Sequence, residues 1–212
     1  MELIQHIVHL DKFIQPFIAS FGPSIYGIFF FIIFAETGFV VTPFLPGDSL
    51  LFVIGALAGG GHLNIWIAYF SLLAAAILGN MVNYWLGYKF GHKVFTHKNS
   101  RWFNHANIER THEFFEKYGG KTIIITRFIP IIRSFAPFVA GMGSMKYKTF
   151  MIYNLIGGFL WVTSITFAGY LFGGTKLVKD NFEYAVLAIV FISLLPAVIE
   201  YLRHKSQSKK KG

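Results

Sequence analysis

Four charged side chains stand in otherwise apolar sequence, and their chemistry is the strongest functional signal in this chain. Glu36 and Asp48 are the only Asp, Glu, Lys or Arg residues in positions 13–88. Arg127 and Arg133 interrupt a second apolar stretch in the same way. At the centre of a bilayer each charge costs about 2.5–3.5 kcal/mol, so four unpaired charges would cost about 10–14 kcal/mol, comparable with the whole stability of a domain. These charges must therefore pair with each other, face water or bind a charged ligand.

The two arginines suit an anionic ligand. A guanidinium offers five N–H donors in a rigid fork that matches a phosphate or a carboxylate. Arg127 and Arg133 are six residues apart, and on one regular helix they would point about 240° away from each other. A bend of the chain at Pro130, with a second at Pro137, would let both guanidiniums converge on one phosphate.

The two acids have three roles open to them. Glu36 and Asp48 could be resting partners of the arginines, or they could carry protons, because a low dielectric disfavours the charged form of a carboxyl group. These two roles are compatible, since a carboxylate that an anion displaces from an arginine would then take up a proton. The third role is structural: permanent acid–arginine pairs would only hold two segments together, although buried ion pairs are poor stabilisers.

The composition predicts a membrane domain around these groups. The 212 residues are 54% hydrophobic and 14% charged, with a mean hydropathy of +0.53, which is too apolar for an ordinary soluble domain. The net charge of +9 lies between the apolar segments, so it indicates membrane topology and we expect no nucleic-acid partner. The sequence has no Cys, which excludes disulfides and thiolate metal sites.

Two short apolar segments are predicted to be re-entrant hairpins, one over residues 36–60 and the other over residues 122–145. Proline and glycine disfavour a continuous helix through either segment. The residues that set this geometry are Pro43, Pro46, Gly47, Pro130 and Pro137. Irregular backbone at membrane depth is tolerated only where it is buried in protein or lines a water-filled cavity, so each hairpin is also a predicted site.

Longer apolar segments are predicted to cross the membrane. A Phe-rich run at residues 25–35 begins one span, and the other spans cover residues 65–90, 150–172 and 185–201. Asn80 and Asn83 lie within the second of these, where we expect them to form hydrogen bonds between packed helices.

Amphipathic and basic segments flank the spans. Residues 1–20 have apolar positions at spacings of three and four, which predicts an amphipathic helix at the membrane interface. Residues 92–121 are predicted to be a cytoplasmic amphipathic linker, whose helix, capped by Asn107, either lies on a membrane leaflet or is a solvated connector. The basic tail at residues 203–212 is cytoplasmic by the positive-inside rule, which also places the N-terminus in the cytoplasm.

The second half of the chain repeats the first. F-L-P at 44–46 recurs as F-I-P at 128–130, and G-Y-K-F-G at 87–91 recurs as G-Y-L-F-G at 169–173. Each repeat contains one hairpin, which does not cross the membrane, and one span, which does, so the second copy must be inverted. We therefore predict an all-α polytopic membrane protein built from an inverted repeat of re-entrant hairpin plus transmembrane helix, with flanking transmembrane and amphipathic helices. Such repeats point to a transport site near the midplane.

Other chemistry finds little support. All eight His residues lie in flanks or loops, and His105 and His112 have no third ligand, so we expect no metal and no cofactor. Ser49 has no His or Lys at membrane depth to act as its base, so we do not expect an enzyme. The function is therefore sought in binding and transport.

Three motifs carry a family resemblance. They are E-T-G-F-V-V-T-P-F-L-P-G-D-S-L-L (36–51), G-N-M-V-N-Y-W-L-G (79–87) and F-F-E-K-Y-G-G-K-T-I-I-I-T-R-F-I-P-I-I-R-S-F-A-P-F-V-A-G-M-G (114–143). With these motifs the chain resembles the DedA family, the bacterial branch of the membrane proteins with a SNARE-associated or VTT domain. The resemblance implies a polytopic inner-membrane protein with two facing re-entrant hairpins. It places the family's functional acids at Glu36 and Asp48 and its functional arginines at Arg127 and Arg133.

The resemblance also implies a class of function. The family is associated with envelope homeostasis, dependence on the proton-motive force and lipid translocation. Some members recycle undecaprenyl phosphate, the carrier lipid of cell-wall synthesis, and others move phospholipids. One departure is Asn80, where many relatives have Asp, so a proton step through that acid would be missing here. We therefore expect a translocase for undecaprenyl phosphate whose partners are the lipid phosphate headgroup, membrane lipids and protons.

Two other functions stay open at this point. A phospholipid scramblase or a proton-coupled small-solute transporter would use the same four charges. A membrane scaffold or chaperone would instead use the basic surface of residues 89–121. That function predicts that replacing the basic surface impairs the protein more than replacing Glu36 or Arg127 does.

Overall fold

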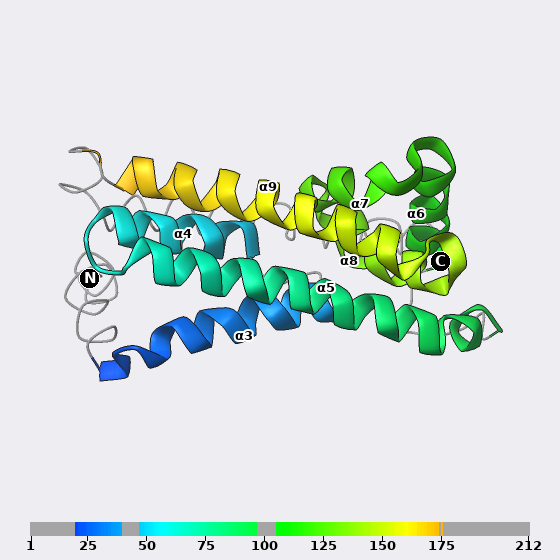
Figure 1. Cartoon of the computed structure of the whole chain (residues 1–212), viewed down its shortest axis with the longest axis horizontal. Helices are drawn as coiled ribbons and strands as arrows, with labels where there is room; N and C mark the ends of the chain where they lie inside the picture. The colour runs from blue at the N-terminus through cyan, green and yellow to red at the C-terminus, as the bar shows by residue number, and fades with distance from the viewer. Residues whose placement is uncertain (1–19, 40–46, 97–104, 174, 176–212) are drawn as a thin grey trace, which may run out of the picture. The chain divides into compact units, whose positions relative to one another are not determined.

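The structure, a computed structural model, describes residues 20–39, 47–96, 105–173 and 175, and every regular element within those ranges is helical. The α-helices are α3 (Ser24–Gly38), α4 (Gly47–Gly59), α5 (Ile65–Thr96), α6 (His105–Tyr118), α7 (Thr122–Ile125), α8 (Pro130–Val139) and α9 (Tyr147–Gly173), as Figure 1 shows. Between them lie two 3-10 segments, η1 (Gly119–Lys121) and η2 (Thr126–Phe128), and a π-helical segment, η3 (Ala140–Ser144). This agrees with the predicted all-α fold class.

Several predictions fall outside the described residues. They concern Pro43, Pro46 and three segments, which are the amphipathic helix at residues 1–19, the span at 185–201 and the basic tail at 203–212. These stay predictions, as does the cytoplasmic position of both termini.

The described residues belong to two compact units, which we treat one at a time. The first unit comprises the described parts of Met1–Ile25, Pro46–Ala68 and Ile165–Gly212. The second unit comprises those of Tyr26–Leu45 and Tyr69–Ser164. Helices α5 and α9 contribute residues to both units, as does α3, of which only Ser24 and Ile25 belong to the first. Helix α4 belongs to the first unit, and α6, α7 and α8 belong to the second.

Two of the described helices, α5 and α9, are long and apolar enough to cross a membrane. The stretches Ile65–Gly91 and Tyr147–Gly173 have mean hydropathies of 1.9 and 1.6. Each has 27 residues, which measure about 40 Å as a helix and exceed a hydrocarbon core of about 30 Å. The most apolar part of each is only 39% or 33% buried inside the protein, unlike the core helix of a soluble domain.

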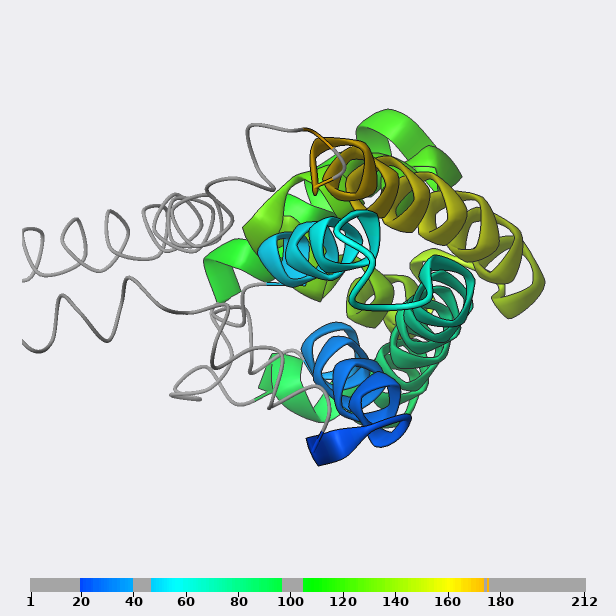
Figure 2. The same ribbon diagram turned by 90° about the vertical axis from the view of Figure 1, so that its left-hand side faces the viewer.

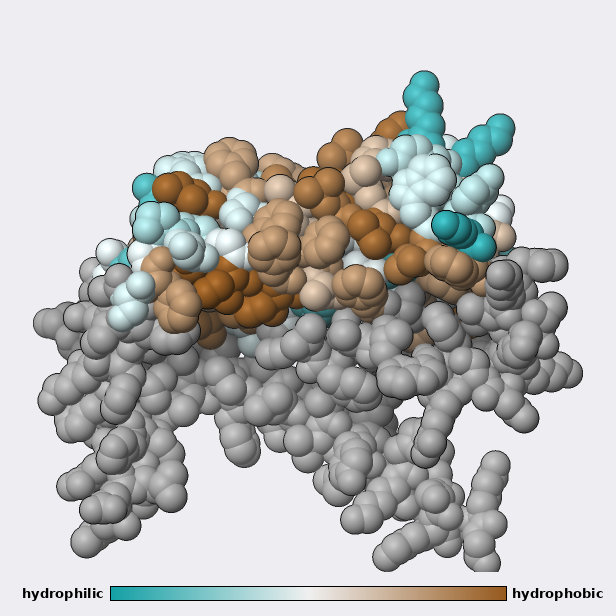
Figure 3. Space-filling view, turned by 90° about the horizontal axis from the view of Figure 1, so that it is seen from below, coloured by the Kyte–Doolittle hydropathy of each residue, from teal (hydrophilic) through white to brown (hydrophobic). Residues whose placement is uncertain are grey.

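The outward side of α9 consists of large apolar side chains. Five of them are 44–53% exposed: Ile152, Leu155, Ile156, Phe159 and Leu160. Figure 3 shows apolar side chains over much of the described surface on the face it presents. A contiguous apolar surface of this kind needs a lipid or protein partner to cover it. Because α5 and α9 are candidate membrane spans, lipid is the partner that we expect to cover this surface.

Helix α5 begins at a polar cap rather than in apolar sequence. The Asn64 side-chain oxygen accepts hydrogen bonds from the backbone N–H groups of Trp66 (3.0 Å) and Ile67 (3.2 Å). Gly61, at φ +86°, supplies the left-handed backbone that the preceding turn needs. The helix then continues to Thr96, beyond the end of the predicted span at 65–90.

In the first unit α4 and the last turns of α9 cross at very short range (Figures 1 and 2). A Cβ added at Gly55 would lie 2.0 Å from the backbone oxygen of Thr166. One added at Gly169 would lie 2.1 Å from the backbone oxygen of Phe52. Only glycine allows this approach, which is the usual device for close packing of helices in membranes.

The second unit contains the same crossing between other elements. A Cβ at Gly87 of α5 would lie 2.0 Å from the oxygen of Phe138, and one at Gly141 would lie 2.0 Å from the oxygen of Tyr84. These contacts correspond to those of the first unit at a constant offset of 82 residues in the long helices and 86 in the short segments. The internal repeat seen in the sequence is therefore also a repeat of packing, while its inversion stays a prediction.

Helix α3 runs through Glu36 and ends at Gly38, so this acid lies in the last helical turn. The next described helix, α4, begins at Gly47. Since residues 40–46 lie outside the description, re-entry of the chain over 36–60 stays a prediction.

The second predicted hairpin is broken where the sequence indicates. Ile129 is extended (φ −117°, ψ 102°), and α8 begins at Pro130, whose missing N–H costs nothing at the first helical position. The helix continues through Pro137, and Gly143 at φ +122° ends the π-helical segment that follows. The break at Pro130 is therefore present, whereas α8 runs on past Pro137.

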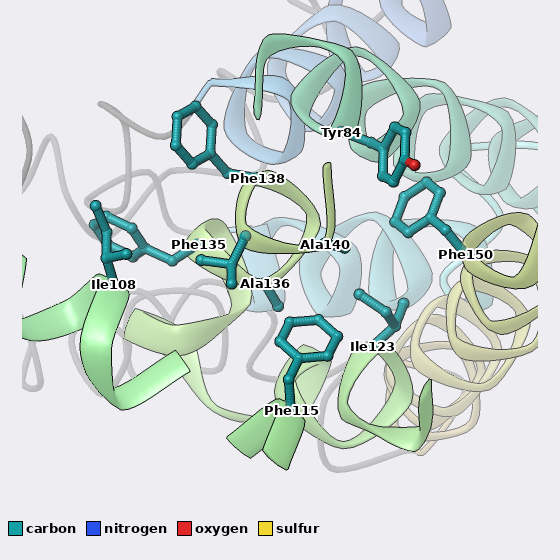
Figure 4. Close-up of a cluster of buried hydrophobic side chains, with 10 residues drawn as sticks. Tyr84, Ile108, Phe115, Ile123, Phe135, Ala136, Phe138, Ala140 and Phe150 are labelled. Carbon is teal, nitrogen blue, oxygen red and sulfur yellow. The ribbon is translucent and has the colours of Figure 1, made fainter. Parts of the chain in front are cut away.

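Helix α6 is amphipathic as predicted, but its apolar side packs against protein. It begins at His105, two residues before the expected cap. Ile108 and Phe115 are 1% and 8% exposed and join a cluster with Phe135 and Ala136 of α8, toward which they point in Figure 4. This packing accounts for the apolar residues Ile108 and Phe115, while the two alternatives for the linker, a leaflet-bound helix or a solvated connector, stay predictions.

We expect this packing to be measurable. Phe115→Ala should destabilise the protein by about 3 kcal/mol or more, because it leaves a cavity in the cluster. Phe114→Ala, on the same helix but only half-buried, is the matched control and should change stability much less. Thermal unfolding in detergent micelles measures both. Equal effects of the two changes would contradict the packing of α6 on α8.

Candidate functional site

The second unit contains a buried ion pair between Glu36 and Arg133. Nη2 of Arg133, on α8, donates to Oε1 of Glu36, at the end of α3. The two side chains are 2% and 9% exposed, so the pair is nearly sealed from the surface. They are 97 residues apart in sequence. One of the two predicted acid–arginine pairings is thus present in the structure.

Arg127 lies in the same unit with neutral partners. It is 2% exposed, and its Nη2 donates to the side-chain oxygen of Asn154 (2.5 Å) and to the backbone oxygen of the same residue (3.3 Å). Its Nε has no hydrogen-bond partner among the residues described. Within the described part of this unit no carboxylate pairs with Arg127. The two arginines therefore differ: one has a carboxylate partner in the unit and the other does not.

Both guanidiniums face one indole ring. The Cζ atoms of Arg127 and Arg133 lie 5.8 Å and 5.0 Å from the ring centre of Trp161, which is fully buried. The extended residue Ile129 separates η2 from α8 and so changes the direction in which the two side chains point. The predicted convergence of the arginines is present, because the helix is broken between them.

The asparagines of α5 form hydrogen bonds between helices, as expected. Asn83 donates to the backbone oxygens of Thr37 (3.1 Å) and Ser134 (2.9 Å), which ties α5 to α3 and α8. Asn80 donates to the side-chain oxygen of Asn154 (3.1 Å), the same atom that Arg127 contacts. Asn80 is therefore connected to the buried Arg127 through the side chain of Asn154.

Two glycines on α9 make room for Arg127. A Cβ at Gly157 would lie 3.1 Å from both Cδ and Nε of Arg127. One at Gly158 would lie 3.4 Å from its Nη2 and 3.2 Å from Ile77. The group packed against these two glycines is therefore a buried cation.

The site lies beside the middle of a candidate span. Trp161 follows Tyr147, the first residue of α9, by fourteen positions in a helix of 27 residues. A helix of this length centred on the bilayer would put Trp161 close to the midplane. Charges at such a depth are functional-site candidates by their energetic cost alone.

Asp48 belongs to the first unit and is described there. It lies in the first turn of α4, in the first unit, where a carboxylate is favoured by the helix dipole. Gly47 is buried and begins that helix. A role for Asp48 beside an arginine stays a prediction.

Sequence reasoning missed Asn154 and Trp161. Both are fully buried polar or aromatic residues of α9 that touch an arginine. With Gly157 and Gly158 they occupy positions i, i+3, i+4 and i+7, which form one side of a helix. The opposite side is large and apolar, so a stripe of small and polar residues in an apolar span was the available signal.

The chemistry of the site is that of anion recognition. It offers two guanidiniums, one carboxylate and the amide groups of Asn80 and Asn154. Among the described residues, no group of three His, Cys, Asp or Glu side chains is placed to hold a metal ion. His112 and Glu116, whose ring nitrogen and carboxylate oxygen are 3.8 Å apart, lie on the exposed side of α6.

Apolar helices of spanning length, an outward apolar surface and a buried charged site together define a helical membrane protein. A model of the VTT domain matches residues 45–171. The Escherichia coli (strain K12) protein DedA is 51% identical over 205 residues, which cover 96% of this chain and 94% of that protein. The chain therefore belongs to the DedA family of VTT-domain membrane proteins.

More distant relatives also match over most of the chain. The uncharacterized membrane protein ML0287 of Mycobacterium leprae (strain TN) is 42% identical, covering 84% of this chain and 80% of its own length. The inner membrane protein YqjA of Escherichia coli (strain K12) is 31% identical, covering 94% and 90%. No solved structure matches the chain.

A double-mutant cycle should detect a coupling free energy between Glu36 and Arg133. Glu36→Gln or Arg133→Gln alone should destabilise the protein by about 3–5 kcal/mol, because each leaves a buried charge uncompensated. The double change should recover much of that loss, since it removes both charges. Thermal unfolding of the four proteins in detergent measures the coupling. Glu36→Gln with Arg127→Gln is the control cycle.

The control cycle should be closer to additive, because Arg127 contacts Asn154 rather than Glu36. Additive effects for the Glu36 and Arg133 pair would contradict the ion pair.

Proposed function

We propose that this protein is a membrane lipid translocase of the bacterial inner membrane that moves a lipid phosphate, with undecaprenyl phosphate as the substrate we favour. The observation that carries the proposal is the pair of buried guanidiniums at Trp161, beside the middle of a candidate span. The phosphate would cross through this site while the hydrocarbon chain stays in the lipid. No enzyme activity and no cofactor are part of this proposal.

The charge balance of the second unit favours an anionic substrate. Arg127 is buried with neutral partners, and the Glu36 carboxylate already pairs with Arg133. A phosphate would therefore be attracted first to Arg127. A phosphate offers more acceptor atoms than a carboxylate, so it can engage both guanidiniums at once.

Glu36 would couple the movement to protons. A phosphate that reaches Arg133 competes with Glu36 for the same guanidinium. A displaced carboxylate in a site of low dielectric would bind a proton, since burial disfavours its charged form. Proton uptake and substrate binding would thus be linked, which is the simplest route to dependence on the proton-motive force. Asp48 is proposed to act in the same way at the other predicted hairpin.

Two features support a lipid rather than a small solute. The outward side of α9 is apolar and exposed directly behind the stripe that touches the arginines, so lipid and site are separated by one helix. The inner-membrane name of one relative, YqjA, agrees with a location where carrier lipids are used. The positive-inside rule places both termini in the cytoplasm in this scheme.

Transport in liposomes tests the function. Purified wild-type protein should flip labelled undecaprenyl phosphate, and Arg127→Gln or Arg133→Gln should abolish the movement, because each removes one fork of the phosphate site. Lys121→Gln is the matched control, since Lys121 is an exposed cation just before the same segment and should be dispensable. Labelled phosphatidylethanolamine, assayed in parallel, should not move.

Each other outcome is informative. Arginine-dependent movement of both lipids would identify a phospholipid scramblase. Normal movement by the arginine variants would contradict the phosphate site. Movement of neither lipid would favour solute transport, or a scaffold function that depends on the basic residues of 89–121.

A further inference from the structure

We propose that one side of α9, formed by Asn154, Gly157, Gly158 and Trp161, positions the two arginines through uncharged contacts, so that this side of the helix adds no carboxylate that would compete with a phosphate for them. We call these four residues the α9 positioning face. The inference rests on the proposed function, and it assigns to Asn154 and Trp161 the role of positioning residues. They act through the arginines.

The four residues are placed for this task by helix geometry. Their spacing of three, one and three residues brings them to a single side of α9 over two turns. All four are buried, while the intervening positions at 155, 156, 159 and 160 are exposed. The face therefore looks into the second unit, where η2 and α8 carry the arginines.

Asn154 holds Arg127 without neutralising it. Its side-chain oxygen accepts from both Arg127 and Asn80, while its Nδ2 donates to the backbone oxygen of Ile77 (3.1 Å). Both acceptor positions of the amide oxygen and one of the two N–H donors of the amide nitrogen are therefore used, which fixes the orientation of the amide and the position of the guanidinium. An aspartate would occupy the same space and accept the same bond, but it would supply a negative charge. That charge would compete with any anionic ligand of Arg127.

Trp161 makes it possible to bury two like charges close together. The two guanidiniums repel each other, and the indole attracts both through the electrons of its ring, at centroid distances of 5.8 Å and 5.0 Å. Tryptophan is the aromatic residue with the strongest interaction of this type. An apolar side chain of similar size would fill the space but would leave the repulsion uncompensated.

The glycines give the arginine its room. Nε of Arg127, which has no hydrogen-bond partner among the described residues, lies against Gly157. A methyl group there would stand 3.1 Å from that nitrogen, so the arginine side chain would have to shift by a few tenths of an ångström. The α9 positioning face thus combines the amide of Asn154, the ring of Trp161 and the space left by the two glycines, and none of these groups carries a charge.

Binding of a soluble substrate analogue tests this inference. The full-length protein in neutral detergent would be titrated with farnesyl phosphate and, separately, with the uncharged alcohol farnesol, by calorimetry. Asn154→Asp and Trp161→Leu should each weaken binding of farnesyl phosphate by about tenfold or more, the change expected on losing one charge-assisted contact. Neither change should alter binding of farnesol. Trp161→Phe should restore part of the affinity for the phosphate.

Two matched controls separate positioning from folding. Trp85→Leu replaces a half-exposed tryptophan of the same unit and should bind both ligands as the wild type does. Asn83→Asp buries a new charge against the backbone oxygens of Thr37 and Ser134, without a contact to Arg127. Its unfolding temperature should fall well below that of Asn154→Asp, whose charge Arg127 compensates.

The outcomes distinguish this inference from the function on which it rests. If wild-type protein does not bind farnesyl phosphate, the proposed function fails and the positioning role fails with it. If the wild type binds and Asn154→Asp and Trp161→Leu bind equally well, only the positioning role is overturned. Parallel loss of farnesyl phosphate and farnesol binding would also overturn it, because that result indicates a general structural defect.

Discussion

Burying two guanidiniums against one indole is the constraint on which the second unit depends. Two like charges in an apolar helical unit are tolerable only if each finds partners that replace water. Arg133 finds a carboxylate on α3, and Arg127 finds an amide on α9. The end of α3, the asparagines of α5 and the small residues of α9 are all placed so that these contacts can form. The charged site therefore organises the helices around it.

The contacts between helices are short and repeat within the chain. The G-Y-x-F-G motif of each long helix contains the glycine that meets the backbone of a short segment, Gly87 in one unit and Gly169 in the other. Such crossings are stabilised by van der Waals contact between closely packed backbones. This suits a lipid bilayer, where burial of apolar surface contributes little to helix association. They fix a short segment to a long helix in each unit, α4 to α9 in the first and α8 with η3 to α5 in the second. In the second unit, Arg127 and Arg133 lie on either side of the break before α8.

The side chains of α9 show how one helix serves lipid and site at once. Its outward side is Ile, Leu and Phe, and its inward side is Asn, Gly and Trp. The two sides of the helix do not differ strongly in hydrophobicity, because Trp and Gly are themselves compatible with an apolar environment. The two sides of this span thus differ in side-chain size and hydrogen bonding rather than in charge.

The sequence by itself determined the class of the protein, because charge in apolar surroundings, proline breaks and glycine motifs are local signals. It indicated the spans at α5 and α9, the break at Pro130, the internal repeat, the family, and Glu36, Arg127 and Arg133 as charges in apolar sequence. Only the tertiary structure decided which arginine pairs with Glu36, that Asn154 and Trp161 belong to the site, and that α6 packs against α8. These depend on how each helix is rotated about its axis and which neighbour it meets. Sequence periodicity shows that a helix has two different sides. It does not show which residue of a neighbouring helix packs against each side, because that residue comes from a distant part of the chain.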